Sequence, residues 1–401
     1  MTQIHIDRRV LYGFMMLMLV TNAMGYFVLW RPIRAGRNDF PTFYSRAQMV
    51  REGQGARLYD YEAQNSFIRR VSAVPREPFN HVPYELLIFI PFTYLQFIPA
   101  YIAWSLLDLG MLAGVVLLLQ NFRPSGSSFC FIFLIVLGFY PVWYCLLWGQ
   151  DSIVLLFLFA LSFWFWKRGK EDAAGFVLAL GLFRPQLVLP FVLVAFLAGK
   201  WKFVRGFIPG AVLVVTLSTW VVGFHGMADY ARILVSQGTE KSARVLDQQW
   251  KIDPARMATW RGFLWVSLPG EVPSSVRNFL LLSGTFVGLF WAAKKLRSAK
   301  DSASFDLSFA MSVAIIALAS FHSFLNDFSL LIIPILIFGA WLAPPRRVSR
   351  KSGYAIVTLG FLFFLTPLYI ALLWAERVGL LLLPASAAIW LMSREEMTAR
   401  P

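Results

Sequence analysis

Long apolar runs separated by short polar segments dominate this chain. Thirteen runs occur, at 10–30, 84–98, 100–120, 128–147, 152–166, 173–182, 187–198, 206–223, 276–293, 305–321, 328–342, 354–374 and 378–392. A straight helical crossing of a bilayer needs about 20 residues, so the longer runs predict membrane-spanning helices. The runs at 84–98, 173–182 and 187–198 are shorter, and prolines lie within or near them. These three predict broken or re-entrant helices. The pattern as a whole predicts an all-α polytopic membrane protein.

Clusters of lysine and arginine between the runs predict which segments face the cytoplasm. The cytoplasmic clusters are 167–172, 200–205, 294–300 and 344–351. The segments between them are then outside, at 148–152, 183–186, 224–275, 322–327 and 374–377. The run 10–30 follows Arg8 and Arg9 and ends without a small-residue cleavage pattern, so we expect an uncleaved first span with its N-terminus inside. That orientation places 31–83 outside as well.

The number of spans follows from the alternation of sides. If all thirteen runs crossed, the loop 121–127 would lie on the wrong side relative to 167–172. Treating 84–98 as a non-crossing element removes this conflict. We therefore predict one integral membrane domain, 1–401, with about 12 transmembrane helices and two large extracytoplasmic loops, 31–83 and 224–275.

The first of these loops carries apolar residues at helical spacing, namely Phe40, Phe43, Tyr44, Ala47 and Val50. This spacing predicts an amphipathic helix lying on the outer membrane surface, with its arginines at the level of the headgroups. Two long loops on one side of a helix bundle indicate that the function resides at that face.

Composition and charge agree with a membrane location. Of the 401 residues, 58% are hydrophobic and only 15% are charged, whereas a soluble domain carries about 25% charged residues. The formal net charge of +15 lies in short clusters between apolar runs, which favours anionic lipid headgroups over nucleic acid as the partner. Cys130 and Cys145 both lie in apolar segments, so no disulfide framework is expected.

Sequence signatures of soluble enzymes are missing from the chain. It has no Walker lysine motif, no GxGxxG after a strand, no HExxH, no Cys/His cluster and no GxSxG. It also has no DxD, the spacing that holds a divalent metal on a nucleotide sugar. ATP-driven transport and hydrolase chemistry are disfavoured, and we expect neither a cofactor nor a metal.

Polar residues predicted at the outer membrane face remain as candidates for chemistry. They are Asp39, Tyr59, Asp60, His81, Tyr84, Glu85, Gln150, Arg184, Arg261, His322, Asn326 and Asp327. An ionisable residue at the rim of a membrane bundle is a functional hypothesis, because its desolvation is costly. Structural alternatives stand beside it. Asp39 would cap the helix that starts at Phe40, and Asp327 would cap the span that begins at Phe328 or pair with a nearby arginine. Arg184 would extend from a helix end to the interface, and Gln150 would satisfy a broken helix end. His322 would be an interfacial structural histidine.

The order of these features resembles glycosyltransferase family 87, of the GT-C superfamily of polyprenyl-phosphate-sugar-dependent enzymes. The similar segments are "RNDFPTFYSRAQMVREGQGARLYD" (37–60), "FNHVPYELLIFIPFTYL" (79–95), 148–202 with its "WGQDS" and "GLFRPQ", "MATWRGFL" (257–264) and "SFHSFLNDFSLLIIP" (320–334). Two departures occur: Arg184 replaces the family's usual lysine, and Val82-Pro83 replaces a double proline.

The resemblance implies a GT-C-like bundle in which Asp39 is the general base of an inverting transfer. Chemistry agrees, since a carboxylate is needed to accept the proton of the acceptor hydroxyl. The leaving lipid phosphate needs cations, for which Arg184, Arg261 and Arg37 are the candidates. Substrate contacts are expected from Tyr44, Tyr59, Asp60, His81, Gln150, His322 and Asp327. A lipid-open groove for the polyprenyl tail is expected near 84–98 and 173–198.

The leading hypothesis is a glycosyltransferase that moves a mannose-like hexose or a pentose from a polyprenyl-phosphate sugar. The acceptor would be a lipid-linked or cell-envelope glycan at the extracytoplasmic face of the cytoplasmic membrane. A flippase for lipid-linked sugars or a secondary transporter is the alternative, and would place ionisable residues near the bilayer midplane between inverted repeats. A third reading, a non-catalytic scaffold, predicts that Asp39 tolerates substitution.

Overall fold

The computed structural model describes residues 8–74, 79–123, 127–238, 253–341 and 350–398. Within these ranges the chain is helical and contains no β-strand, which confirms the all-α prediction. The α-helices are α1 (Arg8–Arg34), α2 (Phe40–Arg51), α3 (Tyr61–Ile68), α4 (Leu86–Phe89), α5 (Phe97–Leu118), α6 (Phe129–Gly138), α7 (Tyr140–Trp148), α8 (Ser152–Lys167), α9 (Glu171–Ala179), α10 (Pro185–Leu197), α11 (Trp201–Gly238), α12 (Trp260–Ser267), α13 (Ser274–Ser298), α14 (Ser302–Ala319), α15 (Ile332–Trp341), α16 (Arg350–Phe364), α17 (Thr366–Trp374) and α18 (Leu382–Thr398).

Five of these helices are long and apolar enough to cross a membrane. They lie at Arg9–Arg34, Phe97–Leu118, Trp201–Ile233, Ser274–Ser298 and Ser302–Ala319. Two bent helix pairs raise the number to seven if each pair makes one crossing, and four shorter apolar helices accompany them. By length and composition, the described residues therefore support five to seven spans. The count of about 12 and the layout of the two outer loops stay predictions.

Proline explains why two predicted runs are not straight helices. The run 128–147 forms α6 and α7 with a bend of 72°, and Pro141 occupies the first turn of α7. The run 354–374 forms α16 and α17 with a bend of 61°, and Pro367 lies in the first turn of α17. Because proline has no N–H and restricts the residue before it, it starts a helix more readily than it continues one.

The segment 84–98 contains only short pieces before α5 begins. The 3₁₀ turn η2 (Pro83–Glu85), the four-residue α4 and the 3₁₀ turn η3 (Ile90–Tyr94) follow one another. None of them is long enough to cross a bilayer. At the other predicted loop, α11 continues beyond 223 to Gly238 after a break at Gly223, whose φ is 73°. The first part of 224–275 is therefore helical, and 239–252 lies outside the described residues.

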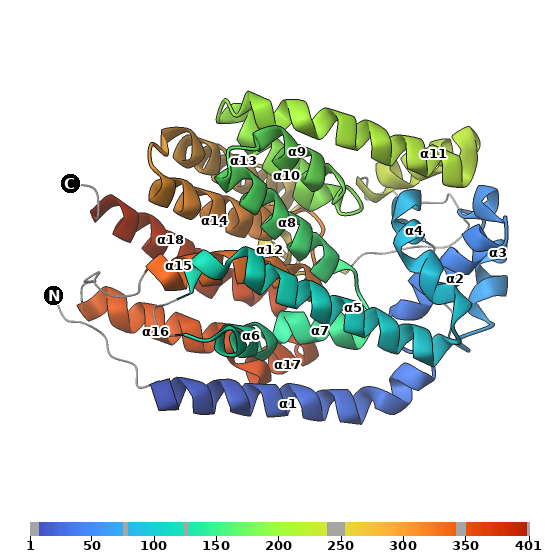
Figure 1. Cartoon of the computed structure of the whole chain (residues 1–401), viewed down its shortest axis with the longest axis horizontal. Helices are drawn as coiled ribbons and strands as arrows, with labels where there is room; N and C mark the ends of the chain where they lie inside the picture. The colour runs from blue at the N-terminus through green and yellow to red at the C-terminus, as the bar shows by residue number, and fades with distance from the viewer. Residues whose placement is uncertain (1–7, 75–78, 124–126, 239–252, 342–349, 399–401) are drawn as a thin grey trace.

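The segment between α1 and α5, residues 35–96, is called the first connection, and its helices form a group at one end of the molecule. Figure 1 shows α2, α3 and α4 together at the end opposite both termini. The predicted helix beginning at Phe40 is present, but it packs within the protein. Phe40, Phe43 and Ala47 are buried, and so is Arg46, which donates to Gln64 Oε1 at 3.0 Å. Arg46 is thus inside the protein rather than at headgroup level.

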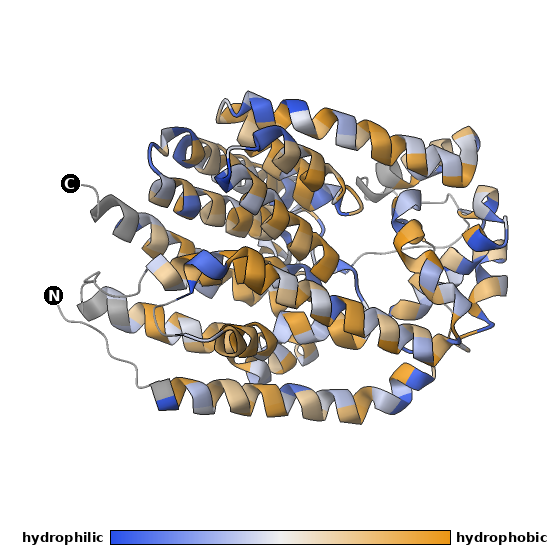
Figure 2. Ribbon diagram, viewed as in Figure 1, coloured by the Kyte–Doolittle hydropathy of each residue, from blue (hydrophilic) through white to orange (hydrophobic). Residues whose placement is uncertain are grey.

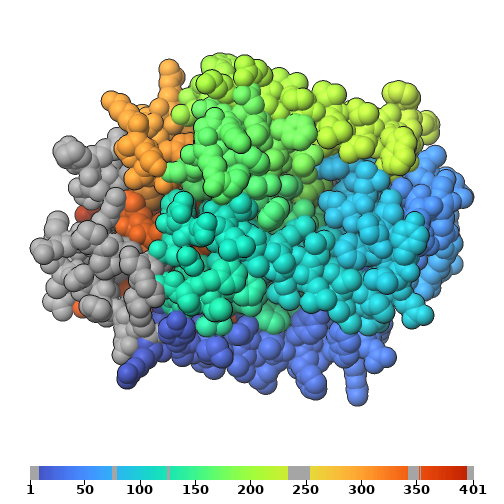
Figure 3. All heavy atoms as spheres, viewed as in Figure 1, coloured from blue at the N-terminus to red at the C-terminus, as the bar shows by residue number. Residues whose placement is uncertain are grey.

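Exposed apolar side chains mark the surface that faces lipid. On α1, Phe27 and Val28 are 84% and 70% exposed, and Trp220 on α11 is 75% exposed. Figure 2 shows α1 as mainly hydrophobic, with hydrophilic residues gathered at its ends. Figure 3 shows α1 and α11 along opposite edges of the surface. Such apolar exposure is unfavourable in water and expected in a bilayer.

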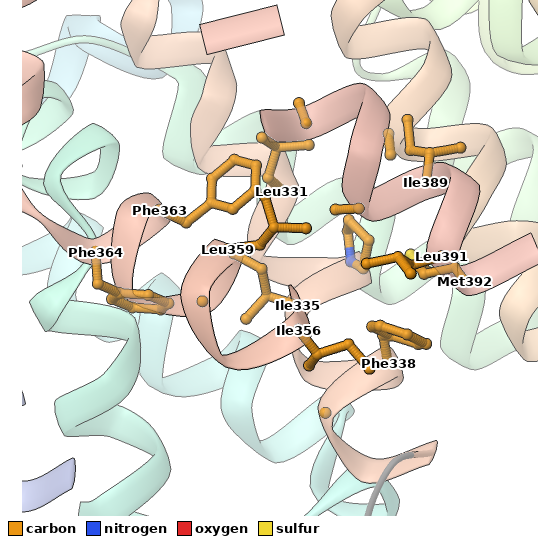
Figure 4. A pocket seen from close by; sticks show the side chains of 16 residues that line it. Leu331, Ile335, Phe338, Ile356, Leu359, Phe363, Phe364, Ile389, Leu391 and Met392 are labelled. Carbon is orange, nitrogen blue, oxygen red and sulfur yellow. The ribbon is translucent and has the colours of Figure 1, made fainter. Parts of the chain in front are cut away.

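An apolar cavity of about 220 Å³ lies among α14, α15, α16 and α18. Ile335, Phe338, Leu359 and Phe363 point toward it in Figure 4. None of the described residues that line it has a charged side chain. The cavity is therefore suited to hydrocarbon and is not where charged chemistry takes place. The groove expected near 84–98 and 173–198 stays a prediction.

Candidate functional site

The start of α2 is held against the end of α7, and this contact places Asp39. The side-chain amide of Asn38 donates to Leu147 O at 3.1 Å, and the backbone N–H of Asp39 donates to Trp148 O at 3.0 Å. These bonds satisfy carbonyls that a helix end leaves open. Gly149 ends α7 with a left-handed φ of 64°, and a Cβ there would lie 2.6 Å from Phe40 Cβ. Glycine is required at 149 for both reasons.

The Asp39 side chain does not cap its helix. Asp39 occupies the N-cap position of α2, but its carboxylate makes no capping hydrogen bond. Its Oδ2 instead accepts from Gln150 Nε2 at 2.6 Å. The cap alternative thus fails for the carboxylate, which points to residues that follow α7.

Arg184 lies behind Gln150 in the protein interior. Its Nη2 donates to Gln150 Oε1 at 2.9 Å and to Asp151 Oδ1, and its Nε donates to Asp151 Oδ1 at 3.2 Å. The residue is only 6% exposed, so the alternative of an arginine reaching out to the interface is wrong. Nη1 donates to no described residue and is not among the fully buried unpaired atoms. One guanidinium nitrogen therefore remains for a ligand.

Asp327 connects this group to Ser152 and to the start of the 3₁₀ segment η7 (Leu325–Leu331). Its Oδ1 accepts from Ser152 Oγ at 2.8 Å, and Arg184 Nε is 3.9 Å from the same oxygen. Its Oδ2 accepts from Ser323 Oγ and from the backbone N–H of Phe324, both at 3.1 Å. Asp327 therefore holds the start of η7 against α8 and Arg184. Both structural roles considered for it, the helix-start contact and the arginine neighbour, are present.

His81 and Glu85 lie next to Asp151. His81 Nδ1 is 3.1 and 3.0 Å from the two carboxylate oxygens of Glu85. The imidazole stacks on Phe79 at 5.2 Å and meets Phe43 edge-on at 5.4 Å. Glu85 is fully buried and hydrogen-bonds with Asp151. The imidazole is thus fixed in orientation by two rings and one carboxylate.

Burial dominates the charge balance at this site. Three buried carboxylates, Glu85, Asp151 and Asp327, surround one buried cation, Arg184. Desolvation raises the pKa of Glu85 from 4.5 to about 7 and that of Asp151 from 3.8 to about 7, although Arg184 opposes both shifts. Since the two carboxyls contact each other, they titrate as a coupled pair that shares a proton near neutral pH.

His81, Glu85 and Asp151 also have the spacing of a small cation site. One donor atom from each lies within 4.8 Å of the others. A shared proton gives a simpler account of the same contacts. It joins the carboxyl of Glu85 to that of Asp151. The trio is therefore read as a protonated acid pair beside a histidine.

His322 and Arg261 lie beside this group. Burial lowers the pKa of His322 from 6.5 to about 4, and the charges acting on it include Asp327, Arg184 and Arg261. The ring is therefore neutral at pH 7, and its buried Nδ1 has no hydrogen-bond partner in the described part of the chain. Arg261 lies over the Phe321 ring at 4.1 Å and donates to Phe321 O at 3.5 Å.

The remaining predicted site residues stand apart or serve the framework. Arg37 is exposed in the turn before α2. Tyr44 and Tyr59 donate their hydroxyls to Leu95 O and His81 O, at 2.7 and 2.8 Å. Asp60 caps α3 through the N–H groups of residues 62 and 63 and pairs with Arg57 at 2.7 Å. The phosphate contact expected of Arg37 and the substrate contacts expected of Tyr44, Tyr59 and Asp60 stay predictions.

Asp151 and Ser152 belong to the site but were not among the residues selected from sequence, and Glu85 was selected as a polar candidate without an assigned role. One signal was available: Asp151 directly follows Gln150 in "WGQDS", ahead of an apolar helix. A buried arginine needs a carboxylate partner, but the sequence does not show that Arg184 is buried.

The shared proton predicts a pH-dependent stability. Folding raises the pKa of Glu85, so the folded state holds this proton more tightly than the unfolded chain does. This stabilisation is complete below about pH 4 and is lost as the pH rises through about 7. In Glu85→Gln the side-chain amide remains a hydrogen-bond donor toward Asp151 at every pH. The melting temperature of the variant minus that of the unmutated protein should therefore increase as the pH is raised from 5 to 8. Thermal unfolding in detergent measures this difference.

The control for that experiment is the exposed Glu62, changed to glutamine. It should show no such trend with pH. An equal loss of stability in Glu85→Gln at every pH would mean that the pair does not share a proton.

Together these features define a helical membrane protein with a charged, largely buried site that joins its first connection to α8, α10 and η7. Comparison with known families places it further. The model of glycosyltransferase family 87 matches residues 79–321, more than half of the chain. The chain belongs to glycosyltransferase family 87 and is a membrane glycosyltransferase. Asp39, His322 and Asp327 lie outside the matched range. No curated protein and no solved structure matches the chain.

Proposed function

We propose that this protein transfers a mannose-like hexose or a pentose from a polyprenyl-phosphate sugar to a lipid-linked or cell-envelope glycan. The transfer takes place at the extracytoplasmic face of the cytoplasmic membrane, inverts the anomeric centre and needs no metal. One observation carries the proposal: a carboxylate, Asp39, and a cation, Arg184, are joined through Gln150 in one hydrogen-bonded group.

The two ends of this group suit the two halves of a glycosyl transfer. The Asp39 carboxylate accepts the proton of the acceptor hydroxyl while that oxygen forms a bond to the anomeric carbon. The bond from this carbon to the phosphate oxygen breaks, and its electron pair leaves with polyprenyl phosphate. Arg184, through Nη1, stabilises the phosphate charge.

Neighbouring residues complete the proposed site. Arg261 supplies a second cation for the phosphate. Neutral His81 and His322 offer ring nitrogens to sugar hydroxyls, because both have their pKa lowered to about 4. Family membership favours this transferase over a lipid-linked-sugar flippase or a transporter.

A transfer assay tests the proposal. Purified protein in nanodiscs is given radiolabelled polyprenyl-phosphate sugars, one hexose or pentose at a time, with envelope glycolipids as acceptors. We expect one donor to label the glycolipid, with and without EDTA, and NMR of the product to show the opposite anomer. Transfer from a nucleotide sugar, or from none of the polyprenyl donors, would overturn the proposal.

A further inference from the structure

Gln150 lies between the Asp39 carboxylate, which can only accept hydrogen bonds, and the Arg184 guanidinium, which can only donate them. Its Nε2 donates to Asp39 Oδ2 at 2.6 Å, and its Oε1 accepts from Arg184 Nη2 at 2.9 Å. An ionised carboxylate only accepts and a guanidinium only donates, so the amide has a single satisfactory orientation. Both ends of the side chain are therefore fixed.

The helix-end role considered for Gln150 does not account for this side chain. The backbone N–H of Gln150 already donates to Cys145 O at 3.0 Å, which satisfies the last turn of α7. The side chain is not needed for that contact, and it bonds to Asp39 and Arg184 instead. It connects the first connection, which carries Asp39, to the start of α10, which carries Arg184.

Hydrogen bonds in series polarise one another, and those with ionised groups are the strongest. Arg184 draws electron density from the amide oxygen, which strengthens the donation from Nε2 to Asp39. A phosphate bound at Nη1 would offset part of the field of the guanidinium charge and would shift the position of the group. That change reaches Asp39 through one amide.

We propose that Gln150 is a positioning residue that couples phosphate binding at Arg184 to the orientation and proton affinity of Asp39. This inference rests on the proposed function. It assigns Gln150 a role between donor and base, beyond the substrate contact expected from the sequence.

The test begins with Gln150→Ala and Gln150→Asn, the second of which is too short by one methylene to reach both partners. Each should lower kcat by about 10–100-fold, since a small displacement of a reacting group has this effect. Loss of a donor to a carboxylate disfavours its ionised form, so the acidic limb of the pH–rate profile should move to higher pH. Gln120→Ala, at an exposed glutamine, is the matched control and should leave kcat and the profile unchanged.

A double-mutant cycle tests the coupling itself. Arg184→Lys keeps the charge but loses the planar fork. Combined with Gln150→Ala, it should lower kcat/KM for the donor by less than the product of the two single effects, because both remove the same connection. Fully multiplicative effects would overturn the coupling.

Failure of this inference is distinguishable from failure of the proposed function. If the unmutated protein transfers no polyprenyl-linked sugar, the function fails. If it does transfer and Gln150→Ala keeps the original kcat, donor KM and pH profile, Gln150 is not a positioning residue. Thermal unfolding of each variant shows whether it is folded. Should Gln150→Ala not fold, Gln150→Asn, which keeps an amide, supplies the same comparison.

Discussion

Replacing Asp39 by asparagine is expected to reduce sugar transfer by about 10²–10⁴-fold, the contribution typical of a general base. Asparagine has nearly the same shape, and its carbonyl oxygen still accepts the hydrogen bond that Gln150 Nε2 gives to Asp39 at 2.6 Å. The backbone contact of residue 39 with Trp148 O is also unaffected. The loss therefore comes from removal of the proton acceptor and not from a change of fold. Initial rates with the labelled donor measure it.

The matched control is Asp172→Asn. Asp172 is an exposed carboxylate that pairs with Arg205 at 2.8 Å, on α9 and α11. Solvent-exposed ion pairs contribute little to stability, so this variant should keep full activity. Full activity of Asp39→Asn would exclude Asp39 as the base.

Replacing Arg184 by alanine is expected to have the largest effect on stability. The change leaves Asp151 without its cation and removes the neighbour of Asp327, and both carboxylates are buried. Removing one partner of a buried ion pair costs about 3–5 kcal/mol. The unfolding temperature in detergent should fall by several degrees, and transfer should be lost. Thermal unfolding and the transfer assay measure the two effects separately.

A second substitution separates structure from chemistry at this position. Asp151→Asn in the Arg184→Ala background removes the unpaired charge, so it should restore much of the stability but none of the transfer. Arg184→Lys, which keeps the positive charge, should stay folded and retain transfer with a raised donor KM. If the stabilised double variant were as active as the original protein, Arg184 would have no role in binding the phosphate.

The sequence predicted where most helices of this protein lie along the chain, but not how they bend or what surrounds them. Apolar periodicity located the helices, and Pro141 and Pro367 show why two runs bend. A hydropathy pattern records how apolar a run is but not whether lipid or protein surrounds it. The same limit applies to Arg46, which the spacing of its neighbours placed at the membrane surface and which lies buried beside Gln64.

Some residues of the candidate site could be selected from the sequence, and others could not. Asp39, Gln150 and Arg184 were selected separately from sequence, and the structure brings them into hydrogen-bond contact. Glu85 was a candidate without an assigned role and Asp151 was not selected, because the importance of both comes from pairing across the interior. Asp60 shows the opposite case: a carboxylate in a matching motif whose contacts are those of a helix cap.

The docking of α2 on the last turn of α7 has a consequence for the order in which the protein is made. Asn38 and Asp39 bond to the carbonyls of Leu147 and Trp148, more than 100 residues later in the chain. Gln150 and Arg184 are synthesised later still. As the chain leaves the ribosome from its N-terminus, Asp39 must wait for α7, the link through Gln150 must wait for Arg184 at the start of α10, and the full site must wait for Asp327 in η7. A nascent or truncated chain that ends before Arg184 therefore carries the Asp39 carboxylate without the cation to which Gln150 links it, and the buried group of side chains is complete only once η7 has been made.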